Sequence, residues 1–215
     1  MSTRLKKEIV LHVKSYREII EILQAVRKYL RPYNAYARCD GEKIRLTIYG
    51  SKNDIKFALN EVKSVHKRIR NALYQDANGT YRYDGSLITE RSGVSISLKD
   101  LGKILELKGY KVYIQNNNTI RTSVKLEEVV KLVREYKKLM DGIRDIQPKI
   151  IRKVLCIAAI ITGVDCKSIL KIAVSKGIIK HLDDNRYGFT LPPNEICSKL
   201  IKEVLTSENK NFSEK

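Results

Sequence analysis

The chain has 215 residues, of which 42 are Lys or Arg and 24 are Asp or Glu, so its formal net charge is +18. Charges of one sign repel each other in a compact state, so the excess indicates a polyanionic partner, with nucleic acid first and an anionic membrane surface second. The excess is largest in residues 1–75, which hold 17 basic and 7 acidic side chains.

Residues 1–75 are predicted to form a basic β-α-β-β-α module. Ser15 with Glu18, and Ser51 with Asp54, have the spacing of a capping box at the start of a helix. The dipeptide Asp40–Gly41 suits the tight turn of a hairpin. The expected elements are a strand at 8–13, a helix from Ser15 to residue 30, strands at 36–39 and 43–49, and a helix from 52 to 72.

Residues 76–147 are predicted to repeat this order as a second β-α-β-β-α module. Ser97 and Asp100 are expected to cap a helix that Gly109 ends. The two modules would be ferredoxin-like or related two-layer folds, although α+β chains also give this order by chance. The expected elements are a hairpin of strands 80–83 and 86–90, a helix at 98–108, strands at 111–115 and 119–124, and a helix at 126–140.

Residues 148–206 are predicted to form a winged helix-turn-helix-like domain, followed by a flexible tail at 207–215. The stretch GVDCKSILKIAVSKGIIKHLDDNRYGFTLP resembles that family, with Asp165 capping the second helix and Gly177 ending it. Asp183 and Asp184 at the wing tip would repel DNA, so this surface suits protein or structured RNA better. The expected elements are helices at 149–162 and 166–176, strands at 178–182 and 186–191, and a helix from 194 to about 205.

A basic stripe is the main candidate for a binding surface in the α+β chain. Five cations of the predicted helix at 52–72 fall within about 60° of its circumference, apart from the apolar arc. Further cations come from the first helix, and two tyrosines of the first hairpin could stack on bases. A solvated helix face and tyrosines packed at a sheet edge are the alternatives. The candidate nucleic-acid-binding residues are Lys52, Lys56, Lys63, Lys67, Arg70, Arg27, Lys28, Arg31, Tyr36 and Tyr49.

Catalytic and metal-binding patterns are not found in the sequence. The four cysteines and three histidines lie far apart without a CxxC pair, which argues against a zinc site and against a secreted disulfide framework. We therefore expect no enzymatic activity, no cofactor, no metal and no small-molecule substrate. The longest apolar run, 154–164, is too short to span a bilayer, and the start of the chain lacks a signal-peptide core. A cytoplasmic protein without a membrane partner is expected.

Two stretches, LKDLGKILELKGYKVYIQNNNTIRTSVKLEEVVKLVREY and GVDCKSILKIAVSKGIIKHLDDNRYGFTLP, resemble an uncharacterised family of small basic archaeal proteins of crenarchaeal type. This resemblance implies no functional residues. Our hypothesis is a non-enzymatic protein that binds structured RNA, as a regulatory factor associated with the ribosome or a ribonucleoprotein. One alternative is a winged-helix transcription factor on duplex DNA, and another is a protein-interaction adaptor that docks a protein partner at the winged-helix domain.

Overall fold

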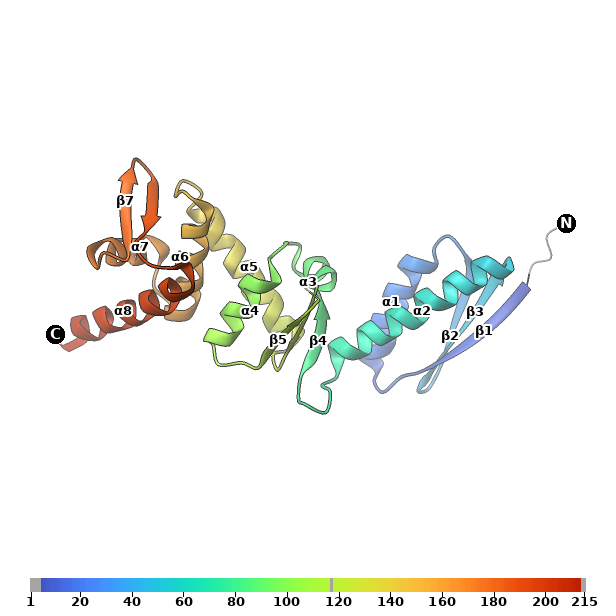
Figure 1. The fold of residues 1–215 in the computed structure, drawn as a ribbon. Coiled ribbons are helices and arrows are strands. Elements are labelled where there is room, and N and C mark those ends of the chain that lie inside the picture. The colour runs from blue at the N-terminus through green and yellow to red at the C-terminus, as the bar shows by residue number, and fades with distance from the viewer. Residues whose placement is uncertain (1–4, 117, 214–215) are drawn as a thin grey trace. The chain divides into compact units, whose positions relative to one another are not determined.

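The computed structural model describes residues 5–116 and 118–213, and it divides into two compact units, Met1–Tyr83 and Asp84–Lys215 (Figure 1). Within the described residues there are eight helices and three small sheets, which confirms the α+β class. The division falls within strand β4, beyond the module boundary expected at residue 75. The division into three modules, 1–75, 76–147 and 148–206, therefore stays a prediction.

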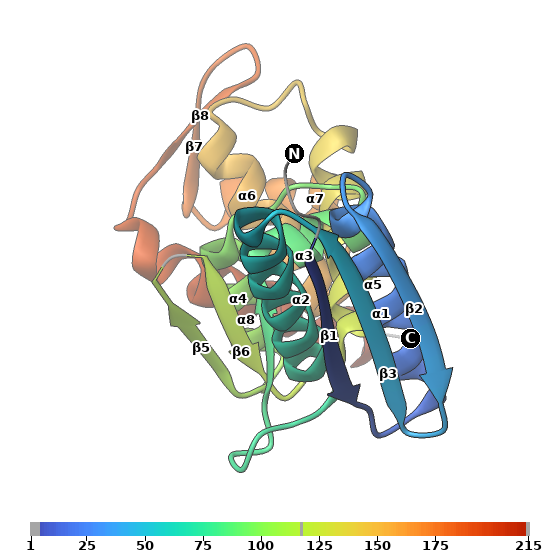
Figure 2. The same cartoon turned by 90° about the vertical axis from the view of Figure 1, so that its right-hand side faces the viewer.

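The first unit has the predicted order β-α-β-β-α and places both helices on one face of its sheet (Figure 1). The strand order is β1-β3-β2, with β3 between the other two strands (Figure 2), and each neighbouring pair is antiparallel. Ile44, Leu46 and Ile48 of the central strand point into the core beneath the helices, where they are buried. The elements are β1 (Leu5–His12), α1 (Tyr16–Leu30), β2 (Asn34–Asp40), β3 (Lys43–Gly50) and α2 (Lys52–Leu73).

The predicted caps of the first unit form, with one difference. The Ser51 side chain and the Asp54 carboxylate bond each other's backbone N–H groups, which completes the capping box of α2. Ser15 likewise accepts the N–H of Glu18, but the Glu18 carboxylate accepts the N–H of Lys14 at 2.7 Å instead of that of Ser15. Glu18 is fully buried, so its side chain belongs to the interior more than to the cap.

The segment from residue 81 to residue 142, which crosses the boundary between the two units, has the order β-α-α-β-β-α, and one predicted strand in it is wrong. Residues 86–90 lie in helix α3, which ends at Gly93 with a φ of 73°. Leu87 and Ile88 are adjacent and both buried, which a helix allows but a half-buried strand with alternating faces does not. The elements are β4 (Tyr81–Asp84), α3 (Gly85–Ser92), α4 (Leu98–Leu107), β5 (Val112–Gln115), β6 (Thr119–Thr122) and α5 (Leu126–Gly142).

The second sheet has the order β4-β6-β5, so that, as in the first sheet, the last strand lies between the other two. The side-chain capping bonds predicted at the start of α4 do not form. Ser97 is the N-cap residue but makes no side-chain capping bond, and Asp100 instead pairs with Lys153 of helix α6 (Lys149–Thr162) at 2.7 Å. An acidic residue near a helix start is thus used here to join two helices.

The C-terminal part follows the predicted order of helix, helix, hairpin and helix. Its apolar side chains share one hydrophobic cluster with Ile104 of α4 and Tyr136 of α5. The last helix extends beyond residue 205, so the tail predicted at 207–215 is helical up to Ser213, and residues 214–215 lie outside the described residues. Hydroxyls of Thr206 and Ser207 bond helical carbonyls there, which accommodates polar residues within the helix. The elements are α6 (Lys149–Thr162), α7 (Cys166–Ser175), β7 (Ile179–Asp183), β8 (Arg186–Phe189) and α8 (Pro193–Ser213).

Removal of the Asp165 cap should weaken the second unit in a pH-dependent way. The hydroxyl and N–H of Ser168 lower the pKa of Asp165 below its usual value of 3.8, and the N–H of Lys167 also bonds the carboxylate. Because the folded pKa is the lower one, this stabilisation is present above about pH 4 and is lost as the pH falls through the folded value. We expect Asp165→Ala to lower the free energy of unfolding by about 1 kcal/mol at neutral pH.

Urea denaturation followed by circular dichroism at neutral pH and in acid measures this loss, with the exposed Asp145→Ala as the control. A difference between Asp165→Ala and the wild type that stays constant through acidification would contradict the role of the carboxylate.

Candidate nucleic-acid interface

The first sheet has an outer face that points away from both helices. Because successive strand residues point to opposite sides, the neighbours of Ile44, Leu46 and Ile48 face away from the core. This outer sheet face holds four Lys or Arg side chains, one histidine and only two carboxylates. In the register of the three strands its residues are Lys6, Glu8, Val10, His12, Asn34, Tyr36, Arg38, Asp40, Lys43, Arg45, Thr47 and Tyr49.

Tyr36 and Tyr49 form a pair on the outer sheet face. Their ring centroids are 6.1 Å apart and the ring planes are nearly perpendicular. Tyr36 remains 67% exposed, so its ring is accessible to a ligand. The one carboxylate pair on this face, Glu8 with Arg45 at 3.4 Å, is itself about half exposed and neutralises little of the charge. Exposed aromatic rings beside cations are the combination on which unpaired bases stack.

The basic stripe of α2 lies in the helix layer, away from the outer sheet face. Lys52, Lys56, Lys63 and Lys67 are exposed, whereas the apolar side of the helix is buried. Arg27 and Lys28 of α1, and Arg31 directly after it, are exposed in the same layer. The ten candidate residues therefore fall on two surfaces of the first unit, with eight cations on the helices and two tyrosines on the sheet.

Arg70 differs from the lysines of the stripe because it neutralises a buried carboxylate. Its Nε lies 3.6 Å from Oε1 of Glu18, and Nε2 of His66 lies 3.5 Å from the same oxygen. The other carboxylate oxygen of Glu18 accepts the hydroxyl of Tyr74 at 3.0 Å and the N–H of Lys14. A buried charge is costly unless it is paired, so Arg70 has a structural task.

The Glu18 cluster was not predicted, although the sequence carries a signal for it. Glu18 precedes Ile22, Val26 and Leu30 at steps of four residues, and all four are buried on α1. A carboxylate on the apolar side of a helix indicates a buried partner of opposite charge. The capping-box pattern accounts for Glu18 by local contacts alone, whereas its burial depends on packing against the rest of the unit.

A groove lies at the end of the first unit and contains residues of both surfaces. It has a volume of about 730 Å³ and is here called the end groove. Two predicted residues, Arg31 from the end of α1 and Tyr49 from the sheet, line it. The full lining is Arg31, Pro32, Tyr33, Asn34, Tyr49, Gly50, Ser51 and Asp54.

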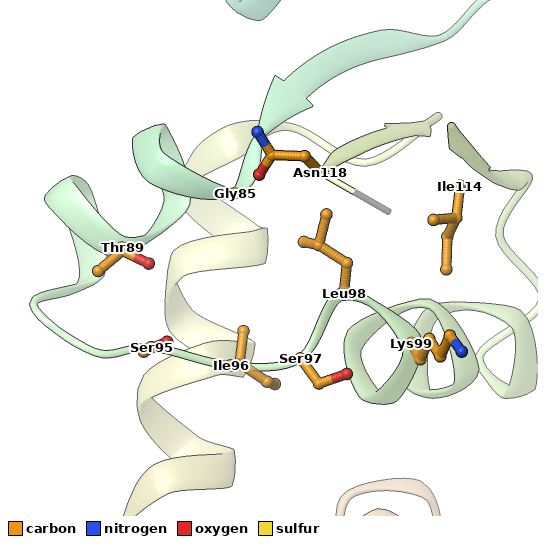
Figure 3. Close-up of a pocket in the computed structure, with 9 residues that line it drawn as sticks. All are labelled: Gly85, Thr89, Ser95, Ile96, Ser97, Leu98, Lys99, Ile114 and Asn118. Carbon is orange, nitrogen blue, oxygen red and sulfur yellow. The ribbon is translucent and has the colours of Figure 1, made fainter. Parts of the chain in front are cut away.

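A second, smaller pocket of about 370 Å³ lies in the second unit around the start of α4 (Figure 3). The side chain of Leu98 reaches into its middle (Figure 3). The walls are mainly hydroxyl and aliphatic groups, with one cation, Lys99. The lining residues are Gly85, Thr89, Ser95, Ile96, Ser97, Leu98, Lys99, Ile114 and Asn118.

Neither a metal-binding cluster nor a membrane-spanning helix is found among residues 5–116 and 118–213. No group of three or more His, Cys, Asp or Glu side chains among them could hold a metal ion. No helix among them is both long enough and apolar enough to cross a membrane.

The fold defines an α+β protein whose small antiparallel sheets are covered by helices, with an aromatic and basic sheet face in its first unit. The chain belongs to a family of uncharacterized proteins conserved in archaea (DUF2067), whose model matches residues 11–191. This confirms the archaeal family indicated by the sequence. Comparisons with curated proteins and with solved structures give no match.

Arg70→Ala should destabilise the protein, whereas Lys63→Ala should not. Loss of the guanidinium leaves the buried Glu18 carboxylate with weaker compensation, which we expect to cost about 1–3 kcal/mol of unfolding free energy. Lys63 is an exposed side chain of the same helix, and its truncation should change that free energy by less than about 0.5 kcal/mol. Urea denaturation of both variants measures the difference, and equal midpoints would show that Arg70 is an ordinary member of the stripe.

Proposed function

We propose that this protein is a non-enzymatic RNA-binding protein that associates with the ribosome or another ribonucleoprotein. The observation that carries the proposal is the outer sheet face, where the Tyr36 and Tyr49 rings lie among basic side chains. Bases in single strands, loops and bulges can unstack and lie on such rings, whereas the bases of duplex DNA remain stacked and paired. The tyrosines bind bases, and Lys6, Arg38 and Lys43 bind the phosphates around them.

The topology of the first unit supports a ferredoxin-like or related two-layer fold. Its β-α-β-β-α order and its strand order β1-β3-β2 leave one sheet face to the helices and the other to a ligand. Sheets of this kind bind RNA across the uncovered face in RNA-recognition modules. The second sheet repeats the strand order, which supports the same interpretation for its β-α-α-β-β-α segment.

The lysine stripe of α2 adds a second, sequence-independent contact. Lys52, Lys56, Lys63 and Lys67 bind phosphates, and each contact releases counterions and makes the affinity salt-dependent. A short DNA operator contacts one surface of a binding module. A folded RNA can contact both the sheet face and the helix layer of the module. This distribution favours a large structured RNA, such as that of a ribonucleoprotein, as the partner.

The C-terminal part is proposed to be a winged helix that docks a second surface of the complex. The order α6, α7, β7, β8 supports this fold. The recognition-helix position is taken by α7, which exposes Lys167 and Lys171, while the wing exposes Asp183 and Asp184. Two carboxylates at the wing tip repel phosphates, so the charge of this surface does not favour duplex DNA. Only the order of the elements supports DNA binding. A protein partner suits this surface better.

The two tyrosines should carry base stacking, and the lysines should carry salt dependence. With a labelled single-stranded RNA of mixed sequence, we expect Tyr36→Ala with Tyr49→Ala to weaken binding by about 1–3 kcal/mol per stacked base. Lys63→Ala with Lys67→Ala should weaken it too and make the slope of log affinity against log salt shallower by about 1 to 2. Fluorescence anisotropy across a salt series measures both effects.

Tyr16→Ala is the matched control, because Tyr16 is 76% exposed but lies on α1 and not on the sheet. Sedimentation of the wild type with ribosomal subunits at low salt, and its release at high salt, would support the ribosomal association. RNA affinity that is unchanged in the tyrosine double variant would exclude the outer sheet face, and stronger binding of duplex DNA than of RNA would favour the transcription factor.

A further inference from the structure

The end groove continues the outer sheet face beyond the tyrosine pair. Tyr49 belongs to both, and Asn34, which also lines the groove, lies directly opposite Tyr49 in the register of β2 and β3. A nucleotide strand stacked on Tyr36 and Tyr49 therefore brings its next base to the groove. Arg31 lies at the same place with an exposed guanidinium that can bind the adjoining phosphate.

The groove contains a carboxylate, which is unusual on a surface that binds a polyanion. Asp54 accepts the hydroxyl of Ser51 at 2.7 Å and its N–H at 3.1 Å, both at Oδ2. These two bonds, the hydroxyl foremost, lower the pKa of Asp54 below 3.8, so the group is ionised at neutral pH. Because the two Ser51 bonds fix the side chain through Oδ2, the lone pairs of Oδ1 can accept N–H groups of a ligand.

Gly50 preserves the space beside this carboxylate. A Cβ at position 50 would lie 3.1 Å from Cβ of Asp54 and 3.4 Å from its Oδ2. Any other residue would thus push against Asp54 and narrow the groove between Tyr49 and the carboxylate. The remaining walls, Tyr33 and Pro32, are flat and largely apolar, which suits a planar ring.

We propose that the end groove is a guanine-binding subsite for an unpaired nucleotide of the bound RNA, with Asp54 accepting the guanine edge. Guanine presents two adjacent donors on its Watson–Crick edge, the N1–H and the N2 amino group, and the two lone pairs of the Asp54 Oδ1 accept both. Adenine, cytosine and uracil each present a single donor group on that edge. The carboxylate repels phosphate, so it selects the base while Arg31 holds the backbone. This subsite rests on the proposed RNA-binding function.

The test measures the affinity of the full chain for short labelled RNAs that differ at one position within an oligouridine. Fluorescence anisotropy compares guanine, inosine, adenine, cytosine and uracil at that position. Guanine should bind about tenfold more tightly than uracil, in line with the discrimination of a base contact made through two hydrogen bonds. Inosine lacks the N2 amino group and should fall between them. Free GMP, added in excess, serves as a competitor.

Asp54→Asn should remove the preference for guanine and leave the affinity for the uracil oligomer intact or slightly higher. Glu61→Gln is the matched control, because it removes one negative charge from an exposed position of the same helix. It should keep the tenfold preference. Circular dichroism of both variants verifies that α2 is retained after the change at Asp54.

Four outcomes would overturn the subsite. Equal binding of all oligomers by the wild type, or a guanine preference that survives in Asp54→Asn, would exclude the carboxylate contact while RNA binding itself stands. Competition by GMP as effective as that by the guanine oligomer would assign the groove to a free nucleotide and not to RNA. Failure of every oligomer and of folded ribosomal RNA to bind would remove the proposed function together with the subsite.

Discussion

The alternation of side chains along β3 is the constraint on which the first unit depends. Ile44, Leu46 and Ile48 fill the space beneath α1 and α2, with at most 1% of their surface exposed. A register shift of one residue would turn these side chains to solvent and bring arginine and tyrosine into the core. The packing of the inner face therefore also fixes the outer face, because β1 and β2 pair with β3 along its whole length. The arrangement of polar and aromatic side chains on the outer sheet face thus follows from the packing of the inner face.

The buried Glu18 imposes a second constraint, on the use of positive charge. Its carboxylate is compensated by Arg70 and lies beside His66, so that part of the cationic excess of the module is used internally. The lysines of the stripe face solvent without such a buried partner. The arginine that stabilises the fold and the lysines that are exposed to a ligand thus lie on the same helix, α2. They differ in whether the cation contacts a buried carboxylate.

Local signals made much of the fold predictable. The Ser51–Asp54 capping box, the Asp165 cap and the glycines that end helices placed most elements close to their true bounds, because each acts within a few residues. Helix α3 was missed since β-branched residues at 88 and 89 favour a strand, whereas burial of Leu87 and Ile88 together is decided by tertiary packing. In this segment, burial of side chains in the core outweighs the local strand propensity.

The candidate site was less predictable for a similar reason. Sequence alone grouped Lys52–Arg70 with the tyrosines as one basic surface, but the two-layer arrangement separates the helix cations from the sheet aromatics. The end groove is built from segments around residues 31–34 and 49–54, and no local pattern relates them. Phosphate contacts supply affinity without sequence information, stacking on tyrosine accepts any base, and hydrogen bonds to base edges discriminate. In the proposed binding mode these three tasks fall on three separate sets of residues of the first unit, so selectivity would depend on a single carboxylate set apart from the cations that would provide affinity.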